Sequence, residues 1–243
     1  MQHASPTFET RPLYLQVHSR LIGFIIQGDW KPGQMIPNEV ELARDFGVSV
    51  GTMRKALQTL TEQGLLKRRQ GRGTYVTEVE SRYGASLDNF RTTNHEPLQW
   101  RVLSVSLTSG VSTDDEAEGL ECSTGEPVFR IRRVQLDEIS KSTMLEQCCV
   151  AQRRFAGLDR DTDAHSLPIA SLARRYGLLI APGAERVDLI VSKPEQAKAL
   201  NIAAGTALLR LMRTAKCFDG IPVDFRIAYC ALKPDTVYEN RIR

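Results

Sequence analysis

Basic side chains gather in one short stretch of an otherwise balanced sequence of 243 residues. Residues 49–73 hold six lysines and arginines against one glutamate, whereas the formal net charge of the whole chain is only +3. A local basic surface on a nearly neutral protein favours a polyanionic partner, most simply a nucleic acid. Arginine and glutamine side chains can make paired hydrogen bonds with the edges of guanine and adenine.

The spacing within this stretch predicts that a helix carries part of the basic surface. Ser49 suits the N-cap position, and Gly64 suits the end of the helix. Apolar residues recur at three- and four-residue steps from Met53 to Leu60, which gives one buried stripe. The opposite face would then point outward, where the Thr52 hydroxyl either contacts a phosphate or remains a plain surface group. The candidate DNA contacts of this helix are Ser49, Gly51, Thr52, Arg54, Lys55 and Gln58.

A basic hairpin is predicted directly after this helix. Residues 65–69 and 73–77 read as two short strands, and the glycine-containing turn between them suits a tight connection. Side chains alternate along a strand, so only one or two of the three basic residues at 67–69 would face a nucleic acid. We expect Arg69, Gly71 and Arg72 to form the contact at the tip.

Two earlier helices are needed to position this helix and hairpin. Residues 12–28 have the apolar spacing of a helix that begins at a proline and ends at a glycine. A second helix follows Asn38, which can form a capping box with Glu41, and ends at Gly47. Three helices and a hairpin, with only three residues linking the second and third helices, predict a winged helix-turn-helix domain at residues 8–77.

The rest of the chain predicts a separate α+β domain. Residues 78–97 are polar and without a sustained period, so we interpret them as a linker. From residue 98 to residue 240, strands follow one another mostly as hairpins with helices inserted, which favours an antiparallel sheet. The predicted strands cover residues 102–107, 128–136, 142–152, 187–191, 208–218 and 223–232, and the predicted helices cover 113–120 (capped by Ser112), 167–176 and 194–200. No internal repeat is apparent.

Two adjacent arginines on one of these strands suggest a second site. Arg132 and Arg133 must point to opposite faces of the sheet, so one of them points into the covered face. A buried arginine is costly unless it is paired. It would either bind an anionic ligand or pair with an internal acid such as Glu146, which lies in the apolar run of the next strand, or Asp224.

The N-terminal pattern resembles the DNA-binding domain of the GntR family of transcription regulators. The motifs that carry the resemblance are Pro12–Val17, Gly28–Gly33, Ile36–Ala43, Phe46–Ser49, Thr52–Leu57, Gly64–Leu65 and Gly71–Val76. The C-terminal part resembles the effector domain of the HutC subfamily, the UTRA domain, whose fold is that of chorismate lyase. The motifs there are Gly125–Arg133, Ser171–Leu172, Tyr176–Gly177, Ala197–Ile202, Gly205–Thr206 and Gly220–Asp224.

This resemblance implies a homodimeric regulator, most simply a repressor, that binds an inverted repeat in double-stranded DNA and is released by a small anionic metabolite. Val40 and Val50 stand where many relatives have DNA-facing arginines, which puts the operator usual for the family in doubt. Asp224 stands where relatives often have a ligand-contacting glutamate. The effector contacts that the resemblance implies are Arg132, Arg133, Glu146, Ser171, Asp224 and Tyr229.

Other function classes find little support in the sequence. None of the common nucleophile, nucleotide-binding or metalloprotease motifs is present, and the five cysteines and four histidines lack the spacing of a zinc site. We therefore expect no catalytic residue, cofactor or metal. The sequence also lacks a secretory signal or membrane span, so we expect a cytoplasmic protein. Two alternatives stay open: a chorismate-lyase-type enzyme with a DNA-binding appendage, and a redox sensor at Cys148 and Cys149.

Overall fold

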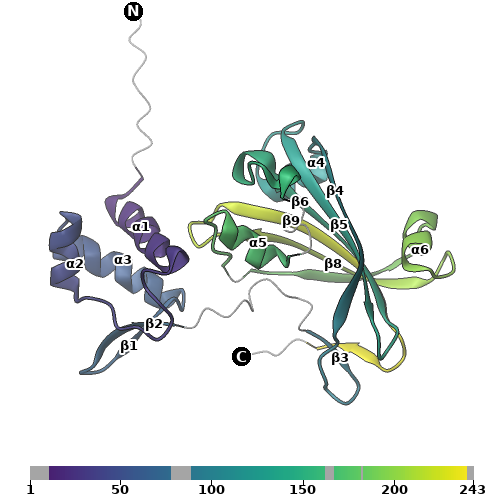
Figure 1. Ribbon diagram of the computed structural model, residues 1–243, viewed down its shortest axis with the longest axis horizontal. Helices are drawn as coiled ribbons and strands as arrows, with labels where there is room; N and C mark the ends of the chain where they lie inside the picture. Colours follow the sequence, from purple (N-terminus) through teal and green to yellow (C-terminus); the bar gives the residue numbers. More distant parts are fainter. Residues whose placement is uncertain (1–10, 78–88, 162–166, 182, 240–243) are drawn as a thin grey trace, which may run out of the picture. The chain divides into compact units, whose positions relative to one another are not determined.

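The computed structural model describes residues 11–77, 89–161, 167–181 and 183–239. The chain divides into two compact units, Met1–Val79 and Glu80–Arg243. Figure 1 shows helices and a small hairpin in the first unit and a large sheet with helices in the second. The α+β class expected from the sequence is confirmed. No helix among the described residues is both long and apolar enough to cross a membrane.

The N-terminal unit is a winged helix-turn-helix. Its helices are α1 (Leu13–Gln27), α2 (Glu39–Phe46) and α3 (Val50–Glu62), and its antiparallel hairpin consists of β1 (Leu66–Arg69) and β2 (Gly73–Val76). The predicted apolar stripe of α3 is buried against α1, with Leu21, Met53 and Leu60 fully inaccessible to solvent. This packing leaves the other face of α3 exposed.

Local capping fixes the turn between α2 and α3. The side chain of Asn38 accepts hydrogen bonds from the first turn of α2, and Glu41 completes the predicted capping box. Gly47, at φ 65°, ends α2 in the left-handed conformation that glycine tolerates. The Oγ of Ser49 then accepts the N–H of Thr52 at 3.1 Å and starts α3. These local bonds explain why the sequence alone predicted this region well.

The C-terminal unit is built on a six-stranded antiparallel sheet in the order β4-β5-β6-β9-β8-β7. Two short strands, β3 and β10, form a separate antiparallel pair. The strands are β3 (Phe90–Thr92), β4 (Trp100–Val111), β5 (Pro127–Asp137), β6 (Thr143–Ala151), β7 (Arg186–Val191), β8 (Ala207–Lys216), β9 (Pro222–Ala231) and β10 (Thr236–Tyr238). The helices are α4 (Asp114–Leu120), α5 (Ile169–Arg175) and α6 (Pro194–Leu200).

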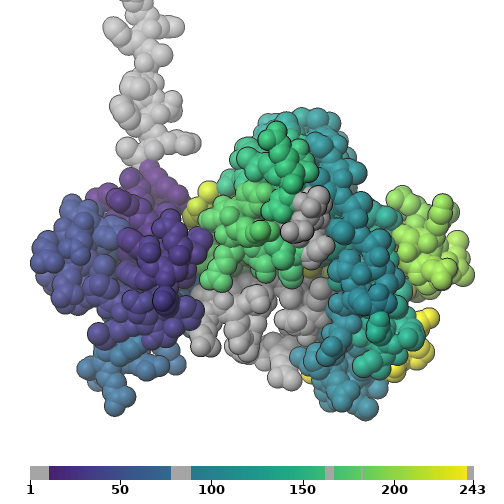
Figure 2. Space-filling model, viewed as in Figure 1, coloured from purple at the N-terminus to yellow at the C-terminus, as the bar shows by residue number. Residues whose placement is uncertain are grey.

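Helices cover both faces of this sheet. On one face, α5 packs with Ile131 and Cys148 in an apolar cluster, while the β3–β10 pair packs on a second cluster around Met144. On the other face, α4 packs near Cys149 and α6 packs near Leu145. Figure 2 shows the segment around α6 as a yellow-green lobe that stands out from this unit. We call the side that carries α5 the inner face.

The sheet contains an internal repeat, so our expectation of none is wrong. The segment β4-α4-β5-β6 and the segment β7-α6-β8-β9 have the same element order, and their strand registers match at a constant offset of 80 positions. Each helix ends at a residue in the left-handed conformation, Glu121 or Asn201. The equivalent pairs include Ser112 and Ser192, Leu120 and Leu200, Gly125 and Gly205, Arg130 and Arg210, and Arg133 and Arg213.

Three boundaries differ clearly from the sequence-based expectation. The strand predicted at 102–107 is longer and spans Trp100–Val111, because it pairs with β5 along its length. Residues 90–97, which we had assigned to the linker, belong to the C-terminal unit, because β3 pairs with β10 and the Leu98 N–H donates to the Phe90 carbonyl. The remaining linker residues, 78–88, lie outside the described residues. The N-cap of α4 is Thr113 rather than Ser112, since the Thr113 side chain accepts the Glu116 N–H.

Candidate DNA-binding and effector sites

The outward face of α3 carries the polar side chains that the sequence placed there. Gly51, Arg54, Lys55 and Gln58 are exposed, and the apolar stripe lies on the opposite side of the helix. Lys55 stacks over the ring of Tyr14 on α1, with its Nζ 3.9 Å from the ring centre. Such cation–π contacts limit the freedom of a long side chain. The basic face of α3 is therefore held in place before any ligand binds.

The first turn of α3 and the tip of the hairpin are also ordered by local bonds. Thr52 bonds through both its N–H and its hydroxyl to Ser49, so both residues serve the helix start. Arg69 stacks on Tyr75 at 4.5 Å from the ring centre, and the Tyr75 hydroxyl donates to the Arg72 carbonyl. Gly71 adopts φ 69°, which the tight turn requires. The side chain of Arg72 is exposed at the tip.

Glu39 is a member of this surface that the sequence analysis missed. Its Oε2 accepts from Arg54 Nε and its Oε1 accepts from Arg68 Nη2, each at 2.7 Å. One carboxylate therefore links α2, α3 and β1. An acidic residue in the first turn of a helix is common because it interacts favourably with the helix dipole. The sequence therefore gave no sign that Glu39 also pairs with two distant arginines.

Glu39→Gln is expected to raise the affinity for random-sequence duplex DNA. The amide removes a negative charge that competes with phosphates for Arg54 and Arg68. We expect the plot of log affinity against log salt to steepen by about one unit, because about one more phosphate contact releases counterions. Fluorescence anisotropy over a salt series measures this slope. Asp45→Asn, which removes an exposed charge from the same helix, is the matched control; equal slopes in both variants would contradict the competition.

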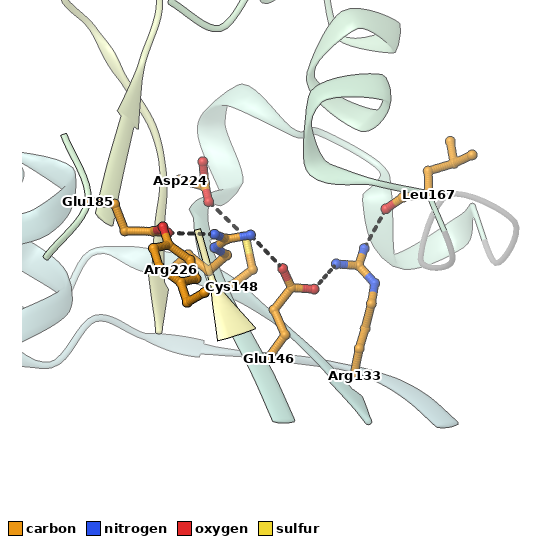
Figure 3. Close-up of polar contacts among 8 residues, drawn as sticks. Arg133, Glu146, Cys148, Leu167, Glu185, Asp224 and Arg226 are labelled. Atoms are coloured by element: carbon orange, nitrogen blue, oxygen red, sulfur yellow. Dashed lines mark hydrogen bonds and ion pairs between the residues drawn. The ribbon is translucent and has the colours of Figure 1, made fainter. Parts of the chain in front are cut away.

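The inner face of the C-terminal sheet carries a buried network of charges between its two apolar clusters (Figure 3). Arg133 donates through Nη1 to Glu146 Oε2 at 2.9 Å and through Nη2 to the carbonyl of Leu167 at 2.6 Å. Both side chains are almost inaccessible to solvent. Burial opposes the ionisation of Glu146, but Arg226 and Arg133 hold its pKa below 4.5. Of the two alternatives left open for an inward arginine, the structure shows the pairing with an internal acid, Glu146.

Arg226 completes this network, and the sequence analysis missed it. It donates through Nη1 to Glu146 Oε1 at 3.1 Å and through Nη2 to Glu185 Oε1 at 2.9 Å. Arg226 is 2% exposed and is the largest fully buried side chain among the described residues. Its place two residues after Asp224 on β9 was a usable signal, because both must point to the same face.

Asp224 lies in the same network but is incompletely satisfied. Its Oδ2 accepts a hydrogen bond from the Cys148 thiol at 3.4 Å, whereas its Oδ1 has no hydrogen-bond partner among the described residues. Complete burial raises the pKa of Asp224 above 3.8, more than the nearby Arg213 and Arg226 lower it. A buried acceptor without a partner is a suitable contact for a ligand donor.

Asp224→Asn is expected to flatten the pH dependence of the free energy of unfolding. The folded protein holds the Asp224 proton more tightly than the unfolded chain does. The protonated carboxyl therefore adds stability below pH 3.8, and this contribution is lost as pH rises through the raised pKa. The neutral amide removes that decline, so the variant should be at least as stable as the parent at neutral pH. Denaturant unfolding at a series of pH values measures it.

Asp137→Asn is a control in which the change in stability at neutral pH should have the opposite sign. Burial opposes ionisation there, but hydrogen bonds from Ser140 and from the Gln99 N–H hold the pKa of Asp137 below 3.8. Its contribution is present at neutral pH and is lost as pH falls through the lowered pKa. Asp137→Asn removes the ionised carboxylate that accepts these hydrogen bonds, so the variant should be less stable than the parent at neutral pH. An unchanged pH slope in the Asp224 variant would show that folding does not raise the pKa of Asp224.

The remaining predicted effector residues lie apart from the charge network. Arg132 points to the face opposite Arg133, as the alternation of a strand requires. Tyr229 also lies on that face, in the apolar cluster that contacts α6. Ser171 is half-buried on α5, one residue before Leu172, which packs in the inner-face cluster. The structure thus brings Arg133, Glu146 and Asp224 onto one face, and places Arg132 and Tyr229 on the other.

The geometry of the cysteines disfavours the redox-sensor alternative. Cys148 and Cys149 point to opposite faces of β6 and are both buried. Burial raises the pKa of both thiols above 9.0. A sensor thiol needs exposure and a lowered pKa, because the thiolate is the reactive form.

Comparison with known proteins agrees with both halves of the structure. Residues 13–76 match the family described as bacterial regulatory proteins, gntR family, and residues 95–233 match the UTRA domain. The chain is 28% identical over 210 residues to the histidine utilization repressor of Pseudomonas putida, covering 83% of this chain and 81% of that protein. It is 27% identical over 215 residues to the mannosyl-D-glycerate transport/metabolism system repressor MngR of Escherichia coli K12, covering 86% and 88%.

The fold is also that of solved structures. PhnF from Mycobacterium smegmatis superimposes with a TM-score of 0.52 at 20% sequence identity, covering 96% of this chain and 99% of PhnF. The helix-turn-helix at residues 13–76 and the effector-type domain that makes up more than half of the chain lead to one assignment. The chain belongs to the gntR family of bacterial transcription regulators, in the group that carries a UTRA domain.

Proposed function

We propose that this protein is a repressor that a small anionic metabolite releases from its operator. The observation that carries the proposal is the buried Arg133–Glu146–Arg226 network on the inner face of the sheet. Replacing a buried ion pair with apolar residues is often neutral or stabilising, so stability alone is a weak reason to keep three such charges. Recognition of a charged ligand is a stronger reason.

The effector would enter between the two apolar clusters of the inner face. Its acidic group would bind the guanidiniums of Arg133 and Arg226, and a donor group would satisfy Asp224 Oδ1. Two similar proteins are named as repressors of systems for histidine and for mannosyl-D-glycerate, which both carry a carboxylate. A carboxylate or phosphate on a small polar molecule is therefore the class that we propose.

The DNA partner would be an inverted repeat bound by a homodimer. One helix-turn-helix head makes few base contacts, so specific affinity requires two heads on two half-sites. We propose that α3 reads the major groove through Arg54 and Gln58, while Arg72 at the hairpin tip contacts phosphates or the minor groove. Contacts between the C-terminal units would hold the dimer together.

Release would follow from a difference in affinity between two conformations. An effector that favours the conformer unfit for DNA by about 1–3 kcal/mol weakens operator binding by roughly 5- to 150-fold. Because its partner is chromosomal DNA, we propose that the protein acts in the cytoplasm. We also propose that the effector domain binds its ligand without converting it.

One set of experiments on the full chain tests this proposal. A DNA site selected from a random pool by the protein should be an inverted repeat, and light scattering should give a dimer at micromolar concentration. A thermal-shift screen of small carboxylic acids and sugar phosphates should find a compound that weakens binding to that site. Arg133→Ala should keep DNA binding and lose the response. A monomer with full affinity, or steady conversion of an aromatic ether acid to products, would overturn the proposal in favour of another assembly or of the lyase-type enzyme.

A further inference from the structure

The charge network does not end at the effector site. Glu185 accepts from Arg226 with one carboxylate oxygen and from the Tyr238 hydroxyl with the other, the latter at 2.7 Å. Tyr238, on β10, in turn accepts from Asn89 Nδ2 at 3.1 Å. A continuous series of polar contacts thus runs from Leu167, beside α5, across three strands of the sheet to Asn89.

Asn89 has a special place in the chain. It is the first described residue after the segment that connects the two units, whose boundary falls between Val79 and Glu80. Its carbonyl accepts the Glu239 N–H at 2.8 Å, and its side chain binds Tyr238. Among the described residues of the effector domain, Asn89 is therefore the one nearest along the chain to the DNA-binding unit, and we call it the tether point.

We propose that the contacts Arg226–Glu185–Tyr238–Asn89 transmit effector binding from the inner face of the sheet to this tether point. The inference rests on the function proposed above, since it assigns the route by which that site acts. An anionic group bound to Arg226 would compete with Glu185, whose carboxylate is repelled by the same anion. The hydrogen bond from the Tyr238 hydroxyl to Glu185 would then weaken. The hydrogen bond from Asn89 to Tyr238 would weaken in turn.

The side chain of Glu185 is the member of this series that is best placed to move. It lies just before β7 rather than within a strand, and its side chain is 13% exposed, more than those of Arg133, Glu146 and Arg226. A surface hollow of about 340 Å³ is lined by Glu185, Arg213 and Phe225, among others. Glu185 therefore borders open space into which its carboxylate can move.

The β3–β10 pair, which carries Tyr238, is small enough to respond to the loss of one hydrogen bond. β3 and β10 pair over only three residues each, and a two-stranded pair of this length is marginally stable without the packing of Phe90 in the Met144 cluster. The ring of Tyr238 packs against Phe90 with 5.2 Å between ring centres, and its hydroxyl bonds to Asn89 and Glu185. Loss of one hydrogen bond can shift the opening equilibrium of such a pair.

A double-mutant cycle in the full chain, without DNA or effector, tests the coupling. Arg133→Lys replaces the planar guanidinium, whose two Nη atoms bond to Glu146 and Leu167, with one ammonium nitrogen, so it perturbs the far end of the series. Tyr238→Phe keeps the ring against Phe90 and removes the hydroxyl. The readout is amide hydrogen exchange at residues 89–92 and at the Glu239 N–H. Tyr176→Phe, which removes a hydroxyl elsewhere in the same domain, is the control and should leave these amides unchanged.

We expect each of the two variants to speed exchange at these amides by about 2- to 12-fold, the loss of one hydrogen bond's net contribution. The double variant should exchange no faster than the faster single variant, because both break one series. Should Arg133→Lys fail to fold, Glu185→Gln takes its place with the same expectation. If the exchange rate of the double variant equals the product of the two single effects to within about twofold, the proposal is overturned. Independent sites add in free energy, so their effects on a rate multiply. Unchanged exchange in Arg133→Lys would overturn the proposal as well. Neither outcome affects the operator measurements that test the proposed function.

Discussion

Arg226→Met should destabilise the protein by about 3–5 kcal/mol, the usual result of removing one partner from a buried ion pair. The guanidinium is fully enclosed and bonds to both Glu146 and Glu185. Methionine fills most of the space but leaves Glu185 with the Tyr238 hydroxyl and Glu146 with Arg133 alone. Equilibrium unfolding in denaturant, followed by circular dichroism, measures the change.

Arg101→Met is the matched control for this substitution. Arg101 pairs with Glu138 on the surface of the same domain, with both side chains more than half exposed. Exposed pairs contribute about 0–1 kcal/mol, so the control should be close to the parent. Similar losses in the two variants would mean that burial of Arg226 has no special energetic consequence. Because Arg226 helps to hold the pKa of Glu146 below 4.5, the pKa of Glu146 should rise in Arg226→Met.

Arg54→Ala should weaken binding to the selected operator by about 1–3 kcal/mol, the range for one well-placed arginine–base contact. The side chain is exposed on the outward face of α3, and the adjacent Met53 stays buried in the core. We therefore expect little change in thermal stability. Titration of the operator and of a scrambled duplex by fluorescence anisotropy separates base recognition from general charge attraction.

Arg44→Ala removes the same charge from the exposed surface of α2, where Arg44 contacts only Asp45 among its described ion-pair partners. It should lower affinity for both duplexes slightly and equally. If Arg54→Ala behaves in the same way, then α3 does not read bases through Arg54. The Glu39 variant adds a further check, because freeing Arg54 and Arg68 from their shared carboxylate should raise the affinity for both duplexes.

The sequence predicted the DNA-binding unit well because its structure depends on local signals. The caps at Asn38 and Ser49, the glycine at position 47 and the apolar stripe of α3 all act within a few residues. The alternation of β5 also required that one of Arg132 and Arg133 point inside, and the structure shows that it is Arg133. Alternation along β9 could have excluded Tyr229 from the site, since positions 224 and 229 differ by an odd number and face opposite ways.

Features that depend on distant pairing were not predictable in the same way. Glu146 meets Arg226 because β6 lies beside β9, and nothing local in the sequence gives that neighbour. β3 is too short to show a period, and its partner β10 lies near the other end of the chain. The repeat was missed because the identical side chains at matching positions are scattered along the two halves and form no continuous motif. The two halves also share the register in which their strands pair, and this register is visible only in the folded structure.

The repeat has a consequence for stoichiometry. Two equal halves facing each other across an approximate twofold axis would present two equal ligand sites. Here the equivalent positions 146 and 226 hold a glutamate and an arginine, and these two side chains bond to each other across the β6–β9 seam. In the proposed function, this charge inversion would join the two half-sites into one effector site, and α5 packs over one end of that face of the sheet. Calorimetric titration with the effector should therefore saturate at one equivalent per chain.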